Sequence, residues 1–315
     1  MLHLFTLLSI IFSRCFTYCL EDNRSYASKE GERLNIGLIG TGNMGTILTE
    51  AFIESKAVNP SSITITNRTI EKAFNIKKNH PEVEVTKQLS GAVTDKDFIF
   101  VCVKPLDIYP LLKELSPLLK EQQTIVIITS PVHPEQLQDI VPCQTARLIP
   151  SITNRALSGA SLLTFGSSCN VTTKAALRQL ACRISTPIEI HHSITRAASD
   201  IVSCGPAFIS FLVQKMIEAA VEETDISKEE ATTLSEDMLV GLGRLIEKRV
   251  YTLPTLQEKV CVKGGVTGEG IKALEAGVQD MFHQLFQNTH DKFDEDVEAV
   301  AHQYPPSVFT DDLRN

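Results

Sequence analysis

The stretch "NIGLIGTGNMG", residues 35–45, sets the expectation for the fold. Its apolar first half is typical of a buried strand, and a helix is expected to begin at Asn43. Between them, Gly40, Gly42 and Gly45 form a G-x-G-x-x-G frame, which in a strand-to-helix context indicates dinucleotide binding. A chance match in a glycine-rich loop is the alternative. We expect the cofactor's pyrophosphate to lie against Gly40, Thr41, Gly42, Asn43, Met44 and Gly45.

Outward from this loop, short apolar runs alternate with amphipathic stretches. Apolar strands separated by helices predict a parallel sheet that is covered on both faces. The strands are predicted at residues 35–40, 62–66, 83–85, 98–103, 124–129, 145–150, 160–165 and 187–190. The helices among them are predicted at residues 43–56, 69–80, 106–120, 134–140 and 173–184.

After Ile194 the pattern becomes helical only, with helix-period apolar spacing over residues 198–223, 227–250 and 266–290. Ser227 and Glu230 have the spacing of a capping box at a helix start. The fold class is therefore α/β, with an amino-terminal Rossmann-type domain followed by an all-α domain. We assign residues 34–194 to the first, residues 195–304 to the second and residues 305–315 to a tail.

The segment before the first strand, residues 1–33, does not fit the Rossmann pattern. Residues 4–12 resemble the apolar core of a secretion signal, but no Lys or Arg precedes them and they are too short to span a bilayer. Leu34 stands where an initiator Met would be expected, because bacterial start codons such as TTG are read internally as Leu. We hypothesise that residues 1–33 come from a start site placed too far upstream and are not native.

Composition and charge argue against several classes of partner. Hydrophobic residues make up 43% of the 315 positions, and the formal net charge of −8 offers no basic face for a phosphate backbone. We therefore predict no nucleic-acid partner and no membrane insertion. The eight cysteines form no C-x-x-C pair and no histidine-interleaved cluster, so no metal site is predicted. Free thiols are typical of a reducing compartment, which predicts a cytoplasmic protein.

The end of the second predicted strand, "ITNRT", bears on the identity of the cofactor. An acidic residue here would bind the ribose 2′-hydroxyl and favour NAD, but this chain has Asn67 and Arg68. Asn67 does not repel a phosphate and Arg68 can bind one, so we predict NADP(H) as cofactor, with NADPH preferred over NADH. The alternative is that Arg68 is a solvated surface residue.

The fourth predicted strand ends in "VCVKP", residues 101–105. The carboxyl ends of parallel strands line the ligand crevice of such folds. We therefore expect the nicotinamide half of the cofactor to lie near Cys102, Val103, Lys104 and Pro105. Lys104 is uninformative by itself, because a lysine after a strand is more often a solvent-facing charge.

Five separated motifs together resemble the pyrroline-5-carboxylate reductases. They are "IGLIGTGNMG", "NR" at 67–68, "VKP" at 103–105, "CGPAF" at 204–208 and "GGVTGEGIKALE" at 264–275. Within that family, the segments "IPSITNRAL" and "VKGGVTGEGIKALE" are most similar to a subgroup encoded with the late-competence genes of bacilli. The resemblance implies a helical domain that interlocks into a homodimer, with larger rings in some members. It also implies hydride transfer from NAD(P)H to the C=N carbon of 1-pyrroline-5-carboxylate, a small imino acid, giving proline.

The resemblance further implies a substrate site in the glycine-rich stretch at residues 260–275. In the family a "SPGGTT" turn holds the substrate carboxylate by backbone amides, and its last Thr hydrogen-bonds near the ring nitrogen. Gly264 and Gly265 match the paired glycines, and Thr267 matches the last Thr. Lys263 replaces the family's Pro and could bind the carboxylate more strongly or select a different acid, so we include it in the expected catalytic site.

Several positions depart from the family pattern. Val262 and Lys263 stand where the family has Ser-Pro, and Cys204 replaces Ser in "SGSGPA". In "IPSIT", residues 149–153, Ser151 and Ile152 stand where the family's "MPNTP" has Asn and Thr. We expect these changes to touch three sides of one pocket and to shift specificity by about 1–3 kcal/mol for each unpaired group.

Three functions remain open at this point. The first is an NADPH-dependent reductase of pyrroline-5-carboxylate or a related cyclic imine. The second is a diverged, weakly active or inactive regulator linked to competence, sporulation or biofilm formation. A β-hydroxyacid dehydrogenase also begins with G-x-G-x-M-G, but the lysine and glycine motif of its helical domain are not found in this sequence.

Overall fold

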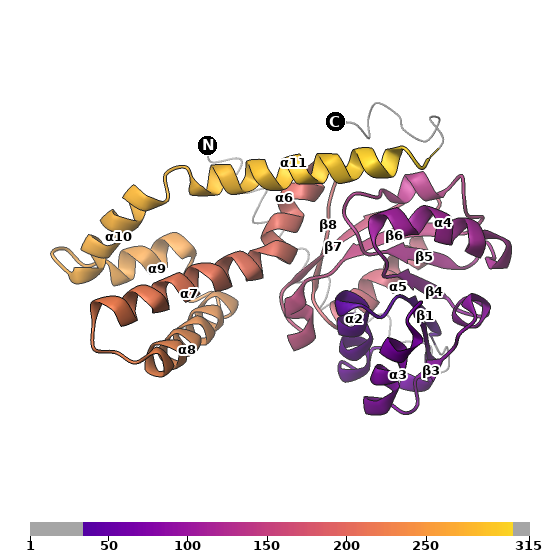
Figure 1. Cartoon of the computed structure of the whole chain (residues 1–315), viewed down its shortest axis with the longest axis horizontal. Coiled ribbons are helices and arrows are strands. Elements are labelled where there is room, and N and C mark those ends of the chain that lie inside the picture. Colours follow the sequence, from indigo (N-terminus) through magenta and orange to yellow (C-terminus); the bar gives the residue numbers. More distant parts are fainter. Residues whose placement is uncertain (1–33, 305–315) are drawn as a thin grey trace. The chain divides into compact units, whose positions relative to one another are not determined.

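A computed structural model describes residues 34–304, so the predicted amino-terminal extension and carboxyl-terminal tail lie outside the described residues. The described chain forms two compact units (Figure 1). The first runs to Cys204 and also includes the residues from Asp291 onward, and the second is Gly205–His290. The predicted domain boundary, after Ile194, falls within the first of these units.

The first unit is built on an eight-stranded sheet in the order β3-β2-β1-β4-β5-β6-β7-β8. Neighbouring strands are parallel except β6 and β7, which pair antiparallel, so the prediction of a parallel sheet is wrong at this pair. Residues 150–159 are too few for the crossover that a parallel return requires, and the chain turns back directly. The strands are β1 (Ile36–Ile39), β2 (Ile63–Thr66), β3 (Glu84–Val85), β4 (Phe98–Val101), β5 (Thr124–Ile127), β6 (Gln144–Ile149), β7 (Ala160–Phe165) and β8 (Thr186–Glu189).

Helices cover both faces of this sheet, as predicted. Leu38 of β1 packs in one core cluster with Phe52 and Leu177, whereas the next residue, Ile39, packs in a second cluster with Ile108. The strands are buried on both sides, which explains their continuous apolar sequences. The helical elements of this unit include α2 (Asn43–Glu54), α3 (Ile70–Asn79), α4 (Pro105–Leu115), a short turn η4 (Pro134–Leu137), η5 (Ile152–Ala156), α5 (Val171–Cys182), α6 (Thr195–Ser199) and the π-helical turn η7 (Asp200–Cys204).

The end of α11 (Met281–Ala301) completes the second core cluster. Val300 has no exposed surface, and Tyr304 is buried with its ring 4.8 Å from that of Tyr109 in α4. Residues at the far end of the described chain therefore share a core with strands that lie near its beginning.

The second unit is entirely helical. Its helix α8 begins with the predicted capping box, because the Ser227 hydroxyl accepts from the Glu230 N–H at 3.2 Å and the Glu230 carboxylate accepts from the Ser227 N–H at 3.0 Å. The helices are α7 (Gly205–Glu223), α8 (Lys228–Glu247), α9 (Leu253–Val260), α10 (Val266–Gly277) and the first part of α11.

Two features of these helices differ from the sequence predictions. The helix predicted over residues 266–290 is interrupted, because α10 ends at Gly277 and α11 begins only at Met281. Helix α9 is missing from the predictions, although Thr252 caps it and Pro254 occupies its first turn. Its shortness and the polar residues around it hide the apolar period.

A buried arginine ties three segments of the first unit together. Arg147 in β6 is 2% exposed, and its Nη1 donates to the carbonyl oxygens of Ser130 at 2.8 Å and Val132 at 3.2 Å, after β5. Its Nη2 donates to the hydroxyls of Thr164 in β7 at 3.1 Å and Thr195 at the start of α6 at 2.8 Å. Burial lowers the pKa of this guanidinium to about 10, so it remains charged at neutral pH.

His133 lies near this buried cation, beside two further histidines. The His133 ring is 5.7 Å from that of His192, which is 4.1 Å from that of His191. Burial lowers the pKa of His133 to about 3, and the positive charge of Arg147 and the neighbouring histidines add to the effect. Its Nδ1 accepts from the N–H of Glu135 at 3.3 Å, so His133 acts as a neutral cap of η4.

We predict that acid destabilises the protein through His133. Its pKa rises from about 3 in the folded chain to 6.5 on unfolding, so the unfolded chain binds a proton first as the pH falls. The free energy of unfolding, measured with urea, should decline from about pH 6.5 towards pH 3, by up to about 1.4 kcal/mol per pH unit from this group. His133→Asn keeps a capping oxygen and does not titrate, so its decline should be shallower.

The control is the substitution of Asn for the exposed His302. In this variant the free energy of unfolding should decline with pH as it does in the parent protein. A decline as steep in His133→Asn as in the parent would contradict the assignment to His133.

Candidate functional site

The glycine loop after β1 is packed so tightly that two of its glycines have no room for a side chain. Gly40 has a φ of 101°, and a Cβ there would lie 2.4 Å from the carbonyl oxygen of Cys102. A Cβ on Gly45 would lie 2.0 Å from the carbonyl oxygen of Gly40. Gly42 is exposed, and no atom lies within 4 Å of the position of a Cβ on it. The loop therefore combines two sterically required glycines with one that faces open space.

Helix α2 begins in this loop without a side-chain cap. Gly42 is its N-cap residue, no acidic residue occupies the first turn, and Asn43 is exposed. The first N–H groups of a helix have no partner within the helix, and the helix dipole adds positive potential there. Thr41 precedes this helix start and Met44 lies in the first turn of α2, and the Thr41 hydroxyl is buried with no hydrogen-bond partner among residues 34–304. The geometry suits an anion that approaches across Gly42.

Asn67 joins the glycine loop to the end of β2. Its Oδ1 accepts from the N–H of Thr41 at 2.9 Å, and its Nδ2 donates to the carbonyl oxygen of Thr69 at 2.8 Å. The lack of charge on Asn67 is evident from the sequence, whereas this cross-link is visible only in the structure. Arg68 is exposed and makes no hydrogen bond or ion pair with the described residues, which leaves its guanidinium available to a ligand.

The segment after β4 supports the glycine loop from the other side. The Cys102 N–H donates to the carbonyl oxygen of Ile39 at 2.8 Å, and Val103 also lies against the loop. Burial raises the pKa of the Cys102 thiol to about 12, so this thiol is neutral. Lys104 is exposed and precedes Pro105, which is the first residue of α4. Since β2, β1 and β4 are neighbours in the sheet, the three predicted cofactor segments meet at one edge.

The predicted substrate turn lies in the second unit, between α9 and α10. Gly264 has a φ of 76°, a conformation that favours glycine, and Gly265 is the uncapped N-cap residue of α10. The Gly265 N–H donates to the carbonyl oxygen of Val262 at 3.0 Å. Val262 and Lys263 are exposed, and Thr267 is half-buried in the first turn of α10. The expected site residues thus form two groups, each built within its own unit.

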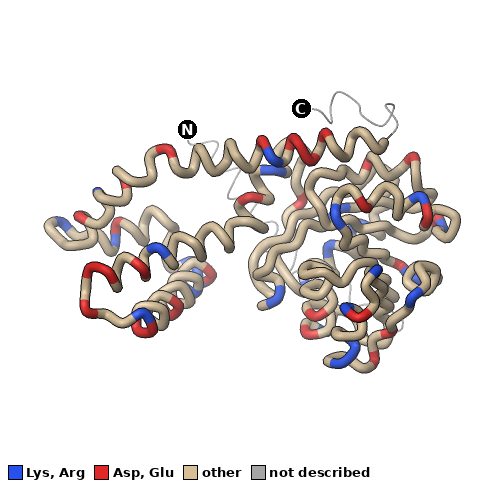
Figure 2. Tube along the Cα trace, viewed as in Figure 1, with Lys and Arg blue, Asp and Glu red and all other residues tan. Residues whose placement is uncertain are grey.

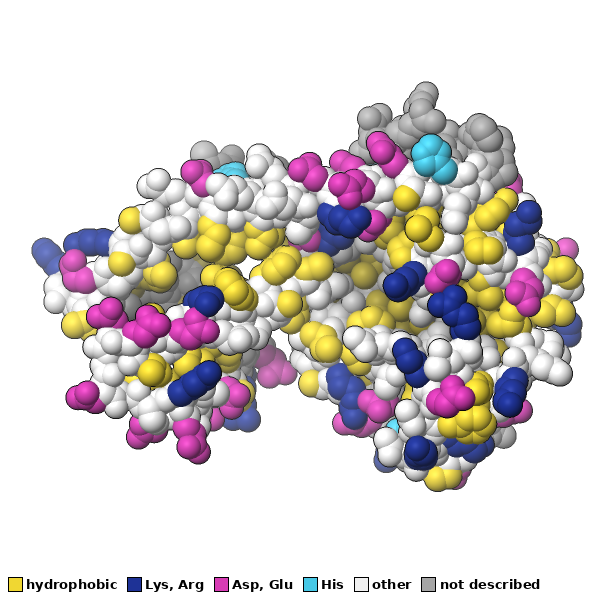
Figure 3. Space-filling view, in the orientation of Figure 1, with side chains coloured by type: hydrophobic (Ala, Val, Ile, Leu, Met, Phe, Trp, Pro, Cys, Tyr) yellow, Lys and Arg dark blue, Asp and Glu magenta, His cyan; other side chains and the backbone are white. Residues whose placement is uncertain are grey.

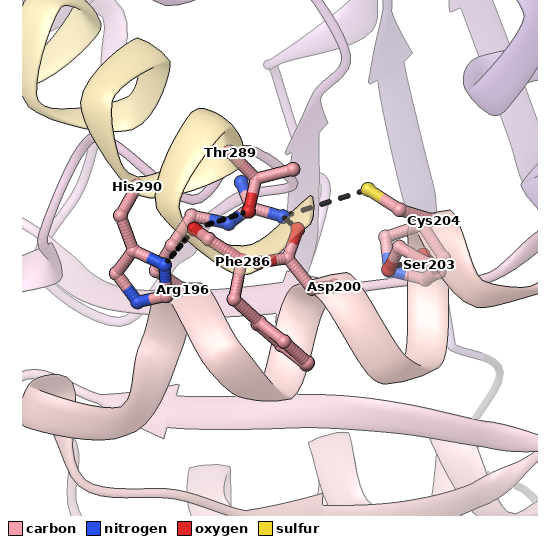
Figure 4. A network of polar contacts seen from close by, with 8 residues as sticks. Arg196, Asp200, Ser203, Cys204, Phe286, Thr289 and His290 are labelled. Carbon is pink, nitrogen blue, oxygen red and sulfur yellow. Dashed lines mark hydrogen bonds and ion pairs between the residues drawn. The ribbon is translucent and has the colours of Figure 1, made fainter. Parts of the chain in front are cut away.

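Two of the departures from the family pattern lie beside the turn η7. The Ser151 hydroxyl is buried and donates to the carbonyl oxygen of Val202 at 2.8 Å. The Cys204 thiol accepts from Nη2 of Arg196 at 3.5 Å, and this guanidinium also forms an ion pair with Asp200 (Figure 4). The Ser151 hydroxyl bonds to the protein itself, and the expectation that the change at this position leaves a substrate group unpaired stays a prediction.

Sequence reasoning missed Arg196 and Asp200. A charged pair spaced four residues apart on an amphipathic helix is usually a solvated surface pair. Here Asp200 is 1% exposed and the Arg196 side chain is 15% exposed. The one available signal was Pro206, which shows that the helix cannot be regular at this point.

The helices of the second unit leave most of their apolar residues uncovered. Within this unit only Ile217, Ala231 and Ser235 are buried, and apolar side chains are visible over its helices (Figure 3). Acidic and basic residues are interspersed along both units (Figure 2). The exposed apolar residues include Ile209, Phe211, Met216, Leu234, Met238 and Leu274.

One described helical stretch, His192–Glu223, is long and apolar enough to cross a membrane by length and composition alone. Only 11% of the most apolar part of this stretch is buried. Core helices of soluble proteins can also be this long and this apolar. Within residues 34–304 no group of three or more His, Cys, Asp or Glu side chains could hold a metal ion.

Comparison with known proteins gives matches to both parts of the chain. Residues 35–131 match the family model described as NADP oxidoreductase, coenzyme F420-dependent, and residues 192–296 match pyrroline-5-carboxylate reductase dimerisation. Among solved structures, the pyrroline-5-carboxylate reductase of Coxiella burnetii superimposes with a TM-score of 0.73 at 22% identity, over 87% of this chain and all of that one. The Plasmodium falciparum pyrroline carboxylate reductase with NADP bound has a TM-score of 0.72 at 19% identity, over 85% of this chain and 98% of that one. These structures show the same fold.

Two relatives from Bacillus subtilis are similar over almost their whole length. ComE operon protein 4 is 61% identical over 271 residues, covering 86% of this chain and 99% of the relative. Pyrroline-5-carboxylate reductase 3 is 31% identical over 270 residues, covering 85% of this chain and 98% of the relative. With these identities and the matched dimerisation model, the chain belongs to the pyrroline-5-carboxylate reductase family.

Proposed function

We propose that this protein is an NADPH-dependent reductase of 1-pyrroline-5-carboxylate or a related cyclic imine. The observation that carries the proposal is the intact cofactor edge, where Thr41, just before the uncapped start of α2, bonds to Asn67, the residue that precedes Arg68. A backbone anion site beside a free guanidinium suits a dinucleotide with a 2′-phosphate. The identity of 31% to a pyrroline-5-carboxylate reductase supports the reaction class.

In this proposal the first unit binds the cofactor. Gly42, Asn43 and the amides of α2 bind the pyrophosphate, and Arg68 binds the 2′-phosphate. When bound, the cofactor supplies a hydride to the imine carbon, and the imine nitrogen keeps the proton that completes the amine. The Cys102 thiol beside this crevice is neutral, so covalent catalysis through it is not part of the proposal.

The turn at residues 263–267 is the proposed substrate anchor. The N–H of Gly264 and the N–H groups at the start of α10, which Gly265 leaves without a side-chain cap, bind the substrate carboxylate in this proposal, and the Thr267 hydroxyl bonds near the ring nitrogen. Lys263 adds a positive charge where the family has a rigid proline, and in this proposal it shifts the preference from pyrroline-5-carboxylate towards a related acid. Positioning and electrostatics supply most of the rate for such a reaction, since a protonated imine accepts hydride without a protein nucleophile.

A homodimer is the proposed working form. The matched dimerisation model and the exposed apolar residues of α7, α8 and α10 support this assignment. A second copy of the chain is the occupant expected to cover these helices, including the apolar stretch within His192–Glu223. The free thiols of Cys102, Cys143, Cys169, Cys204 and Cys261 support a reducing, cytoplasmic location.

A regulatory role is the second candidate function. It is favoured by the 61% identity to ComE operon protein 4 and by the replaced residues Val262 and Lys263. Under this alternative the chain binds NADP(H) or an imino acid as a signal and turns over little substrate.

Complementation of a proline-requiring bacterial strain separates the two functions. We predict growth without added proline when this chain is expressed. Gly42→Asp is the matched negative control, because Gly42 has room for a side chain, a φ of −73° and the N-cap position that Asp favours. The variant should fold, but its new carboxylate should repel the pyrophosphate. The strain that expresses it should therefore not grow without added proline. No growth with a folded parent protein that binds NADPH would favour the regulatory function.

Cofactor preference should depend on Arg68. Removing a charge-assisted hydrogen bond costs about 1.5–3 kcal/mol, so Arg68→Ala should raise the KM for NADPH about 10- to 100-fold and leave the KM for NADH nearly unchanged. Steady-state kinetics with both cofactors measures this. Lys120→Ala removes an exposed positive charge elsewhere and is the control. An equal change for both cofactors would count against the role of Arg68.

Restoring the family's residues at 262 and 263 tests where the substrate site has diverged. We predict that Val262→Ser with Lys263→Pro raises kcat/KM for pyrroline-5-carboxylate about tenfold, by returning a hydroxyl and a rigid turn. The Lys263 N–H donates no backbone hydrogen bond within the described chain, so proline there removes none. The exposed Val266, changed to Ser, is the control. An unchanged kcat/KM would place the divergence elsewhere.

A further inference from the structure

The first turn of α4 contains a carbonyl whose regular helical partner is a proline. In an α-helix the carbonyl of Leu106 accepts from the N–H of residue 110, and Pro110, which lies inside α4, has no N–H. The Nε2 of Gln303 donates to the Leu106 oxygen at 3.0 Å, although the two residues are 197 positions apart in the chain. A side-chain amide from beyond α11 therefore takes the place of the missing main-chain donor.

Gln303 is held against α4 by the residues on either side of it. Val300 and Tyr304 are buried in the second core cluster, and the Tyr304 ring lies 4.8 Å from the ring of Tyr109 in α4. The Gln303 N–H donates to the carbonyl oxygen of Val300 at 2.9 Å, which closes the turn after α11. The Gln303 Oε1 is buried with no hydrogen-bond partner among residues 34–304, which favours a role for the donor of this amide over a role in packing.

The bond from Gln303 lies at one end of the expected cofactor segment. Leu106 directly follows residues 102–105, which we expect to lie near the nicotinamide half of the cofactor. At the other end of this segment, the Cys102 N–H donates to the carbonyl oxygen of Ile39 at 2.8 Å. A backbone bond to β1 therefore holds the start of the segment, and the bond from Gln303 holds the helical turn in which the segment ends.

We propose that Gln303 is a positioning residue: its amide replaces the N–H that Pro110 lacks, fixes the first turn of α4, and so holds residues 102–105 in place for the nicotinamide half of the cofactor. Gln303 acts through the backbone of Leu106 and lies outside the expected cofactor residues. The part of this inference that concerns the cofactor rests on the proposed function, and the part that concerns α4 does not.

Hydrogen exchange of the full-length protein, read by mass spectrometry on peptides that cover residues 106–111, tests the part that concerns α4. Gln303→Met removes the donor but keeps an unbranched side chain, and it should speed exchange there about five- to tenfold. Gln303→Glu places an acceptor against the Leu106 oxygen at neutral pH and should speed exchange further. His302→Met changes an exposed residue of the same turn and is the matched control. Unchanged exchange in both Gln303 variants would overturn the proposal.

A double-mutant cycle with Pro110→Ala tests the cause. Alanine supplies an N–H at residue 110, and Pro110 is exposed, so the substitution removes little packing. In this background the effect of Gln303→Met on exchange should shrink from about five- to tenfold to under about twofold. An equal effect in both backgrounds would show that the amide does not substitute for the donor that proline lacks.

Ligand titration tests the part that concerns the cofactor. Gln303→Met should raise the Kd for NADPH about fivefold, and it should change the Kd for adenosine 2′,5′-bisphosphate, which lacks the nicotinamide, by less than about twofold. His302→Met should change neither. Equal changes for the two ligands, or no change for NADPH, would refute the positioning role, because a general loss of folded protein weakens both. If the parent protein binds neither ligand, the proposed function fails, and the exchange measurements still decide whether Gln303 holds α4.

Discussion

Close contact between Gly45 and the carbonyl oxygen of Gly40 is the constraint on which the cofactor edge depends. A side chain on either residue would collide with backbone atoms, so α2 can leave β1 in this direction only with glycine at both positions. That direction brings the start of α2 to the same edge as the ends of β2 and β4. The bond from Thr41 to Asn67 and the bond from Cys102 to Ile39 then hold the loop from two sides. The open face of Gly42 is a consequence of this packing.

Much of the first unit could be predicted because its chemistry is local. The strands are continuous apolar runs, and the glycine spacing specifies a turn whose geometry depends on neighbouring residues. The antiparallel return of β7 could not be predicted in the same way, because it depends on the length of a connection, residues 150–159, whose ends have no special composition. Helix α9 has its cap and its proline, but too few turns to show a period.

The site could be predicted only as separate pieces. Motif spacing placed Gly264, Gly265 and Thr267 on a glycine turn, and the structure gives this turn a left-handed glycine and an uncapped helix start. Partners far apart in sequence could not be inferred, as Ser151 and Val202 show, because no pattern in either segment indicates the other. A residue that differs from its family suggests, on sequence alone, a changed contact to the substrate. In the structure, the Ser151 hydroxyl donates to the carbonyl oxygen of Val202. The hydrogen bonds that a replaced residue makes with the backbone therefore have to be known before the replacement can be attributed to a different ligand.

The position of Val300 and Tyr304 has a consequence for synthesis of the chain. Domains generally fold during translation as soon as their residues have left the ribosome. The first unit cannot do so completely, because the side chains that close one of its cores come from the last described turn and the whole second unit is translated in between. Until then, α4 carries an uncovered apolar surface around Tyr109. The nascent first unit is therefore a candidate client for chaperones, and its second core closes only after Tyr304 has been translated.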